Sequence, residues 1–245
     1  MLELQNVSYQ VDSDGTDKEI IKNVSLKIDQ RFTAITGPNG GGKSTLAKLI
    51  AGIIKPTSGR ILLDGEDITN DSITDRAKKG ISFAFQQPVR FKGLTVKDLI
   101  TLAAGSEITT SQACLYLSEV GLCARDYIDR EVNASLSGGE LKRIEIAMIL
   151  ARSTKLSIFD EPEAGIDLWS FQNLIEVFEK MHEITKGSII IISHQERILN
   201  IADRIVVIAG GEIEQSGGRE ILPSLLNGNT VGSACSKFLD RKEAH

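Results

Sequence analysis

Two kinds of hydrophobic pattern follow one another along the chain. Near the start, segments 2–4 and 24–28 alternate apolar and polar residues on either side of the polar segment 12–17, which predicts two antiparallel strands with one wet face. Helical-looking stretches separate four short, mostly apolar runs at 32–36, 81–85, 156–159 and 188–192. Such runs are typical of strands buried on both faces. The pattern therefore predicts an α/β fold with a central, mostly parallel sheet and an N-terminal antiparallel β edge.

A helical insertion is predicted between the second and third of these runs. Residues 95–130 contain no strand-like run, but Leu115, Leu117, Val120 and Leu122 follow one another at helical intervals after a helix-start signal at Ser111. We expect an inserted helical subdomain at about residues 88–152 within one domain that spans 1–217. Residues 218–245 are expected to form a C-terminal extension, with a short helix at 219–226 and a polar tail at 237–245.

Composition narrows the classes of function. The 245 residues are 41% hydrophobic, enough for a substantial core, and 28 Lys and Arg against 33 Asp and Glu give a net charge of -5. This balance gives no overall attraction for phosphate backbones, so we expect no nucleic-acid partner. The apolar runs are too short to cross a bilayer, and no secretory signal is visible at the start, so we expect a cytoplasmic protein. Cys114, Cys123 and Cys235 lack metal or disulfide spacing and are expected to be free thiols.

The strongest motif is GPNGGGKST at residues 37–45, which lies between a predicted strand and a predicted helix. Its glycines allow backbone N–H groups to surround phosphate oxygens, and the following helix directs its positive end to the same anion. Lys43 is expected to reach the β- and γ-phosphates of ATP, and Ser44 to bind Mg²⁺. The candidate nucleotide-binding residues of this loop are Gly37, Asn39, Gly40, Gly42, Lys43, Ser44 and Thr45.

Two further segments carry candidate chemistry. Asp160 and Glu161 end a buried strand, where paired carboxylates are costly unless a cation uses them; we assign Asp160 to Mg²⁺ and Glu161 as general base for the attacking water. Ser137, Gly138 and Gly139 open a predicted helix at 140–152 and form a second anion nest capped by Ser137. A second phosphate site suggests that this segment serves another subunit, although capped glycine turns are also common as structural features.

In their order along the chain, GPNGGGKST, LSGGE at 136–140, IFDE at 158–161 and Ser193-His194 resemble the ABC-type ATPases of the P-loop NTPase class, over roughly residues 2–217. The resemblance implies a Q-loop glutamine at Gln86, preferred over Gln87, that serves catalysis and Mg²⁺, and a switch histidine at His194. It implies an ATP-dependent head-to-tail homodimer in which Lys43 of one subunit and Ser137 of the other hold ATP. It also implies that Tyr9, placed at a strand end, stacks on adenine, although simple packing is the alternative.

Within this family two partners are open. Segments 83–89 and 194–199, together with Glu140 and Gly165, resemble the ATPase of the Suf iron–sulfur assembly system, and a soluble Suf-type scaffold is the preferred partner. Pro162, Tyr9, Gly41 and segment 29–31 depart from that type. The alternative is an ABC transporter subunit that energises a separate membrane permease and is membrane-associated through it. The expected partner surface comprises Val89, Phe91, Leu94 and Val96, with local core packing as the alternative.

Two hypotheses concern charges near the reacting groups. Lys142 and Arg143 are expected to engage Glu161 and to hold it away from water. The free subunit is therefore expected to hydrolyse ATP slowly. Glu163 is expected to be a solvated charge, and a second acid near the metal is the alternative.

Overall fold

The protein contains two sheets with different strand directions. The structure is a computed structural model that describes residues 1–13, 16–133, 135–184 and 186–226. One sheet is antiparallel and has the order β2-β1-β4-β5. Its strands are β1 (Leu2–Ser13), β2 (Thr16–Ile28), β4 (Ser58–Leu63) and β5 (Glu66–Asp67). The expected antiparallel N-terminal strands are therefore present, but they pair with β4 in a sheet of their own and not as an edge of the central sheet.

The central sheet has the order β10-β9-β3-β8-β7-β6 and is parallel except for β10. Its strands are β3 (Phe32–Thr36), β6 (Ile81–Ala84), β7 (Leu156–Asp160), β8 (Ser188–Ile192), β9 (Arg204–Ala209) and β10 (Glu212–Gly217). All four predicted central strands are present. The strand expected to reach Phe85 ends one residue earlier, at Ala84, and the Phe85 side chain is exposed.

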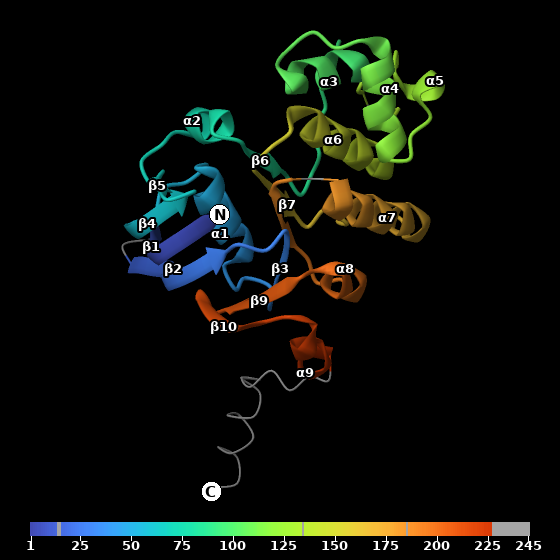
Figure 1. Cartoon of the computed structure of the whole chain (residues 1–245). Coiled ribbons are helices and arrows are strands. Elements are labelled where there is room, and N and C mark those ends of the chain that lie inside the picture. Colours follow the sequence, from blue (N-terminus) through green and yellow to red (C-terminus); the bar gives the residue numbers. More distant parts are fainter. Residues whose placement is uncertain (14–15, 134, 185, 227–245) are drawn as a thin grey trace, which may run out of the picture.

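Helices cover both faces of the central sheet and form a group at one end (Figure 1). This group, between β6 and β7, contains α3 (Val96–Ala104), α4 (Thr110–Glu119), α5 (Ala124–Tyr127) and α6 (Gly138–Arg152). The expected start of α4 at Ser111 is wrong: Thr109 caps it, because its hydroxyl accepts from the Gln112 N–H while the Gln112 side chain accepts from the Thr109 N–H. The other helices are α1 (Lys43–Ala51), α2 (Ile73–Lys78), α7 (Leu168–Ile184), α8 (Glu196–Ile201), the 3₁₀ turn η1 (Arg219–Ile221) and α9 (Leu222–Leu226).

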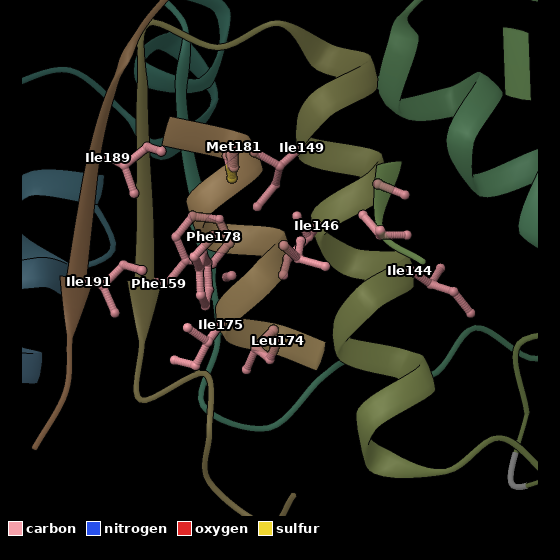
Figure 2. Packing of buried hydrophobic residues seen from close by; sticks show 14 of the residues in the cluster. Ile144, Ile146, Ile149, Phe159, Leu174, Ile175, Phe178, Met181, Ile189 and Ile191 are labelled. Atoms are coloured by element: carbon pink, nitrogen blue, oxygen red, sulfur yellow. The ribbon is translucent and has the colours of Figure 1, made fainter. Parts of the chain in front are cut away.

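The central strands divide the hydrophobic core into two parts by the alternation of their side chains. Ile158 and Ile190 belong to the part that contains α1 and the antiparallel sheet, whereas Phe159 and Ile191 belong to the part formed with α6 and α7. Figure 2 shows Phe178 of α7 against Phe159, and their ring centroids are 5.1 Å apart. Because β3, β6, β7, β8 and β9 run parallel, their carboxyl ends meet at one edge of the sheet.

Several expectations concern the less regular parts of the chain. The short helix expected at 219–226 corresponds to η1 and α9. Cys114 is half-buried and Cys123 is exposed, and both are free thiols. Cys235 and the polar tail at 237–245 lie outside the described residues. Within the described ranges, no helix has the length and apolar composition needed to cross a membrane.

Arg76 of α2 ties the end of α1 to the chain that follows β5. Its side chain is fully buried, and its guanidinium donates to the carbonyl oxygens of Leu49 (2.6 Å), Ile50 (2.8 Å) and Thr69 (3.0 Å). The α1 carbonyls at this end lack partners within the helix, and a cation there also interacts favourably with the helix dipole. Arg76 therefore fixes the helix that begins at the phosphate-binding loop.

We predict that Arg76→Met lowers the free energy of unfolding by about 2–4 kcal/mol, because two buried carbonyls and one partly buried carbonyl lose their charged donor. Denaturant unfolding measures this change. Arg90→Met, at an exposed position, is the matched control and should leave stability unchanged. Equal stability of both variants would contradict this role of Arg76.

Candidate functional site

The segment 37–42 wraps around the side chain of Lys43, between the end of β3 and the start of α1. Lys43 is buried, and its Nζ donates to the carbonyl oxygens of Gly37 (2.8 Å) and Pro38 (3.0 Å). Burial lowers the pKa of Lys43, while Glu161 and Asp160 oppose this shift through their charges. Asn39 and Gly40 are exposed at the tip of the loop, and Thr45 is half-buried in the first turn of α1. The geometry thus sets a cation inside a glycine-rich loop at a helix N-terminus.

Close approach to β9 explains why this loop is rich in glycine. A Cβ atom at Gly37 would lie 2.1 Å from the carbonyl oxygen of Ile208, and one at Gly41 would lie 2.8 Å from the same atom. Gly37 also has φ 131°, in the region that favours glycine. The close approach of the Ile208 carbonyl oxygen therefore explains why position 41 is glycine in this chain.

Asp160 lies beside Ser44, at the end of β7. Its side chain is buried, and the Ser44 hydroxyl donates to Asp160 Oδ1 at 2.8 Å. Burial raises the pKa of Asp160, the Ser44 hydrogen bond opposes this shift, and the nearby charge of Glu161 reinforces it. The structure therefore brings together the two residues that the sequence assigned to Mg²⁺.

Glu161 has partners from two neighbouring strand ends. Gln86, which follows β6, donates its amide to Glu161 Oε2 at 2.7 Å, and Nε2 of His194, which follows β8, lies 3.6 Å from Glu161 Oε1. Glu161 has φ 44°, a left-handed conformation that is uncommon for a residue with a side chain and that clusters at functional sites. Burial, followed by the charge of Lys43, lowers the pKa of His194 and so favours the neutral imidazole near pH 7. The three residues expected to serve catalysis therefore lie together.

Glu163 is not solvated, which corrects the sequence-based expectation. Ser193 donates its hydroxyl to Glu163 Oε1 at 2.5 Å, and the His194 N–H also donates to this carboxyl group. The other oxygen, Oε2, is buried without a hydrogen-bond partner. Burial raises the pKa of Glu163, and the Ser193 hydrogen bond opposes this shift. The sequence missed this contact because Glu163 and Ser193 are 30 residues apart.

The expected contact of Lys142 and Arg143 with Glu161 is absent, and that hypothesis is wrong. The Lys142 side chain is buried, and its Nζ donates to the carbonyl oxygen of Phe85 and to Glu145 Oε2. Arg143 donates to the carbonyl oxygens of Gly139 and Gly121. Helix α6 directs the Lys142 side chain towards the end of β6. The partner of Lys142 therefore cannot be inferred from the closeness of Lys142 and Glu161 in the sequence.

Ser137 caps α6, as the sequence predicts. Its hydroxyl accepts from the Glu140 N–H at 3.2 Å, and the Ser137 N–H donates to Glu140 Oε2 at 2.6 Å. Tyr127 also donates its hydroxyl to Glu140. The glutamate at this position therefore has a structural role. Ser137 and Gly138 are exposed, and Gly139 is packed against Ser170 of α7. This second anion nest is therefore open to solvent at Ser137 and Gly138.

Tyr9 lies inside β1 and not at a strand end, because β1 continues to Ser13. It is half-buried against the antiparallel part of the core and pairs with Ile21 of β2. Ile21 in turn approaches the loop, since a Cβ atom at Gly42 would lie 2.8 Å from its Cδ1 atom. The stacking of Tyr9 on adenine stays a prediction, as do the other ligand-binding and catalytic roles.

The oxygen donors fit Mg²⁺ in chemical type. A serine hydroxyl, a buried carboxylate and an amide oxygen, from Ser44, Asp160 and Gln86, are hard ligands of the kind that Mg²⁺ prefers. The buried Asp160 carboxylate accepts a hydrogen bond from the neutral Ser44 hydroxyl, and a cation there would offset its desolvation. Within the described ranges, no three His, Cys, Asp or Glu side chains form a cluster that could hold a metal alone. A Mg²⁺ ion that also binds substrate phosphates and water needs fewer protein ligands.

Comparison with known proteins agrees with this arrangement. Residues 21–164 match the ABC transporter family. An uncharacterized ABC transporter ATP-binding protein of Methanocaldococcus jannaschii is 42% identical over 82% of this chain and 84% of its own length. The energy-coupling factor transporter ATP-binding protein EcfA1 of Mycoplasma mobile is 36% identical over 89% of this chain and 80% of its own. A solved dimeric structure of the ATP-binding cassette MJ0796 in a post-hydrolysis state, bound to ADP and Pi, aligns with TM-score 0.78 and 26% identity, covering 89% and 99% of the two chains.

The chain therefore belongs to the ABC transporter family of ATP-binding proteins. The predicted ABC ATPase fold and the ATPase class are confirmed, and ATP is its nucleotide. The relatives carry transporter names, and none of these names supports the preferred Suf assignment.

We predict that Glu163→Gln raises the stability of the folded protein near pH 7. The raised pKa means that the protonated carboxyl is favoured in the folded state. The stabilisation that comes from the protonated Glu163 carboxyl is complete below its pKa in the unfolded state, near 4.3. It is lost as the pH rises through its pKa in the folded state. The glutamine variant does not titrate, so its advantage should shrink as the pH falls towards 4. Unfolding midpoints between pH 4 and pH 8 test this, with the exposed Glu179→Gln as control; a pH-independent difference would contradict it.

Proposed function

We propose that this protein is the ATP-binding subunit of an ABC transporter, which dimerises around Mg·ATP and drives a separate membrane permease. The observation that supports this proposal is the meeting of Ser44, Asp160, Glu161, Gln86 and His194 at one sheet edge, beside the loop that holds Lys43. Because the relatives carry transporter names, they favour a permease as partner. The predicted domain from 1 to 217, with its helical subdomain at about 88–152, is the unit that would carry this function.

In this proposal each residue acts on a defined part of the nucleotide. Lys43 and the N–H groups of the loop, from Gly37 to Thr45, bind the phosphates, and Tyr9 stacks on adenine. Ser44, Asp160 and Gln86 would hold Mg²⁺, which would neutralise phosphate charge. Glu161 accepts the proton of the attacking water, and neutral His194 donates its N–H to the γ-phosphate.

The second anion nest completes the site in a dimer. Ser137, Gly138 and Gly139 form the N-terminus of α6, and Ser137 and Gly138 are exposed. A two-fold dimer places this nest on the γ-phosphate that is bound by the other subunit, so each pair of subunits forms two composite sites. Nucleotide binding then closes the dimer and hydrolysis reopens it.

A groove beside the Gln86 segment is the proposed permease surface. It has a volume of about 220 Å³ and is lined largely by apolar side chains, including Phe83, Phe85, Val89 and Phe91. Phe85, Val89 and Phe91 are exposed. Of the residues predicted for this surface, Val96 is fully buried and Leu94 half-buried, because both pack within the helical group. The groove fits a short amphipathic segment of a membrane permease.

We predict that Glu161→Gln lowers ATP turnover by about 10²- to 10⁴-fold while ATP binding is kept, because the variant lacks a general base. Steady-state phosphate release and ATP titration measure the two properties. The same variant with ATP should sediment as a dimer and without ATP as a monomer. Unchanged turnover would remove Glu161 from the mechanism, and a monomer at saturating ATP, also with the permease present, would contradict the composite site.

We predict that Phe91→Asp abolishes co-purification with an integral membrane protein from detergent-solubilised native lysate and leaves basal ATP hydrolysis unchanged. The charge would lie in the apolar groove, where it is costly to bury. Leu115→Asp, at a position that is exposed outside this groove, is the matched control and should still capture the permease. Capture of a soluble scaffold by wild-type protein, with no membrane protein, would favour the Suf-type alternative.

A further inference from the structure

A buried ion pair on α6 binds the peptide groups of Phe85, at the point where β6 ends. The Lys142 side chain is only 2% exposed, and its Nζ lies 3.1 Å from Glu145 Oε2. Lys142 also donates to the carbonyl oxygen of Phe85, and the Phe85 N–H donates to Glu145. Both polar groups of one residue are therefore held by a charged pair of side chains.

The position of Phe85 in the sheet explains why it needs such partners. β6 is the last strand of the central sheet, and its ladder with β7 ends at the Ala84–Phe159 pair. Phe85 therefore lies beyond the last ladder pair, and the contacts with α6 replace the missing strand. Burial raises the pKa of Glu145, while the charge and hydrogen bond of Lys142 oppose this shift. The pair keeps the chain fixed for one residue beyond the strand.

The next residue, Gln86, donates to Glu161 Oε2 and so orients the candidate general base. We propose that Lys142 and Glu145 are positioning residues, which hold the Phe85 peptide groups so that Gln86 keeps Glu161 Oε1 directed to the attacking water. This proposal rests on the function proposed above for Glu161 and Gln86. It adds a route by which α6, the helix capped by Ser137, sets the geometry of its own subunit's base.

A purely structural role would make a different prediction. Buried ion pairs are often replaceable by apolar side chains of similar size without loss of stability. Removal of Lys142 alone leaves the mostly buried Glu145 carboxylate without its cation and is expected to destabilise the fold. The double variant Lys142→Met/Glu145→Met removes both charges and keeps the bulk of both side chains. The double variant should therefore retain its stability, but Gln86 should no longer be held in position.

We test the proposal by ATP hydrolysis with wild type, Lys142→Met, the double variant, and each of these in a Gln86→Ala background. In the double variant we expect kcat to fall about tenfold with KM for ATP nearly unchanged, since loss of orientation affects the transition state more than ground-state binding. In the Gln86→Ala background the same substitutions should cause no further loss. Lys155→Met, which removes an exposed ion pair with Asp64, is the control, and thermal midpoints confirm folding.

Two results would overturn the proposal. A folded double variant with wild-type kcat would show that the pair does not position the base. An equal further loss in the Gln86→Ala background would show that Lys142 acts elsewhere, for example through its charge on Asp160. Failure of the proposed function itself gives a separate result, since it would appear as undiminished turnover of Glu161→Gln whatever the Lys142 variants do.

Discussion

The structure depends on how three carboxyl groups are accommodated at the end of the buried strand β7. Asp160, Glu161 and Glu163 lie within four successive positions, and the cost of desolvating carboxylates requires a polar partner for each. Each partner comes from a different element: Ser44 from α1, Gln86 from the end of β6 and Ser193 from the end of β8. The acids thus connect Ser44, next to the lysine of the glycine-rich loop, with the two strand ends that flank β7.

Helix α6 is the element that connects this acid cluster with surfaces elsewhere on the subunit. Its N-terminus is capped by Ser137, and its first two turns carry Lys142 and Glu145. Ile146 and Ile149 point from α6 towards α7 in the core that the two helices share, whereas Ile144 points away from α7 (Figure 2). Glu145 and Phe85 also line the apolar groove. One rigid helix therefore contacts a candidate phosphate site, the Gln86 segment and the proposed partner surface, so a rigid-body shift of α6 would reach all three.

The chemistry of the nucleotide and the choice of partner are encoded in different ways. Phosphate binding needs glycines with unusual backbone conformations, a lysine and a hydroxyl at fixed spacing, and such a pattern has few other uses. A partner surface needs only exposed apolar side chains of suitable shape, which many sequences provide. For this reason the motifs led to the ABC ATPase class, whereas the preference for a Suf-type scaffold over a permease is not supported by the names of the relatives.

Features that depend on local or periodic patterns could be predicted from the order of the amino acids alone. The four central strands, the capping box at Ser137 and the lysine in its glycine loop follow from burial on two faces, from an N-cap with an acid three residues later, and from backbone freedom at glycine. The partners of charged side chains that are distant in sequence became evident only in the folded protein. Lys142 was expected to contact Glu161 and instead binds the Phe85 carbonyl, and Glu163 was expected in water and instead meets Ser193. These contacts depend on the direction in which a helix face points and on how deeply the end of a strand is buried. No local sequence pattern specifies either property.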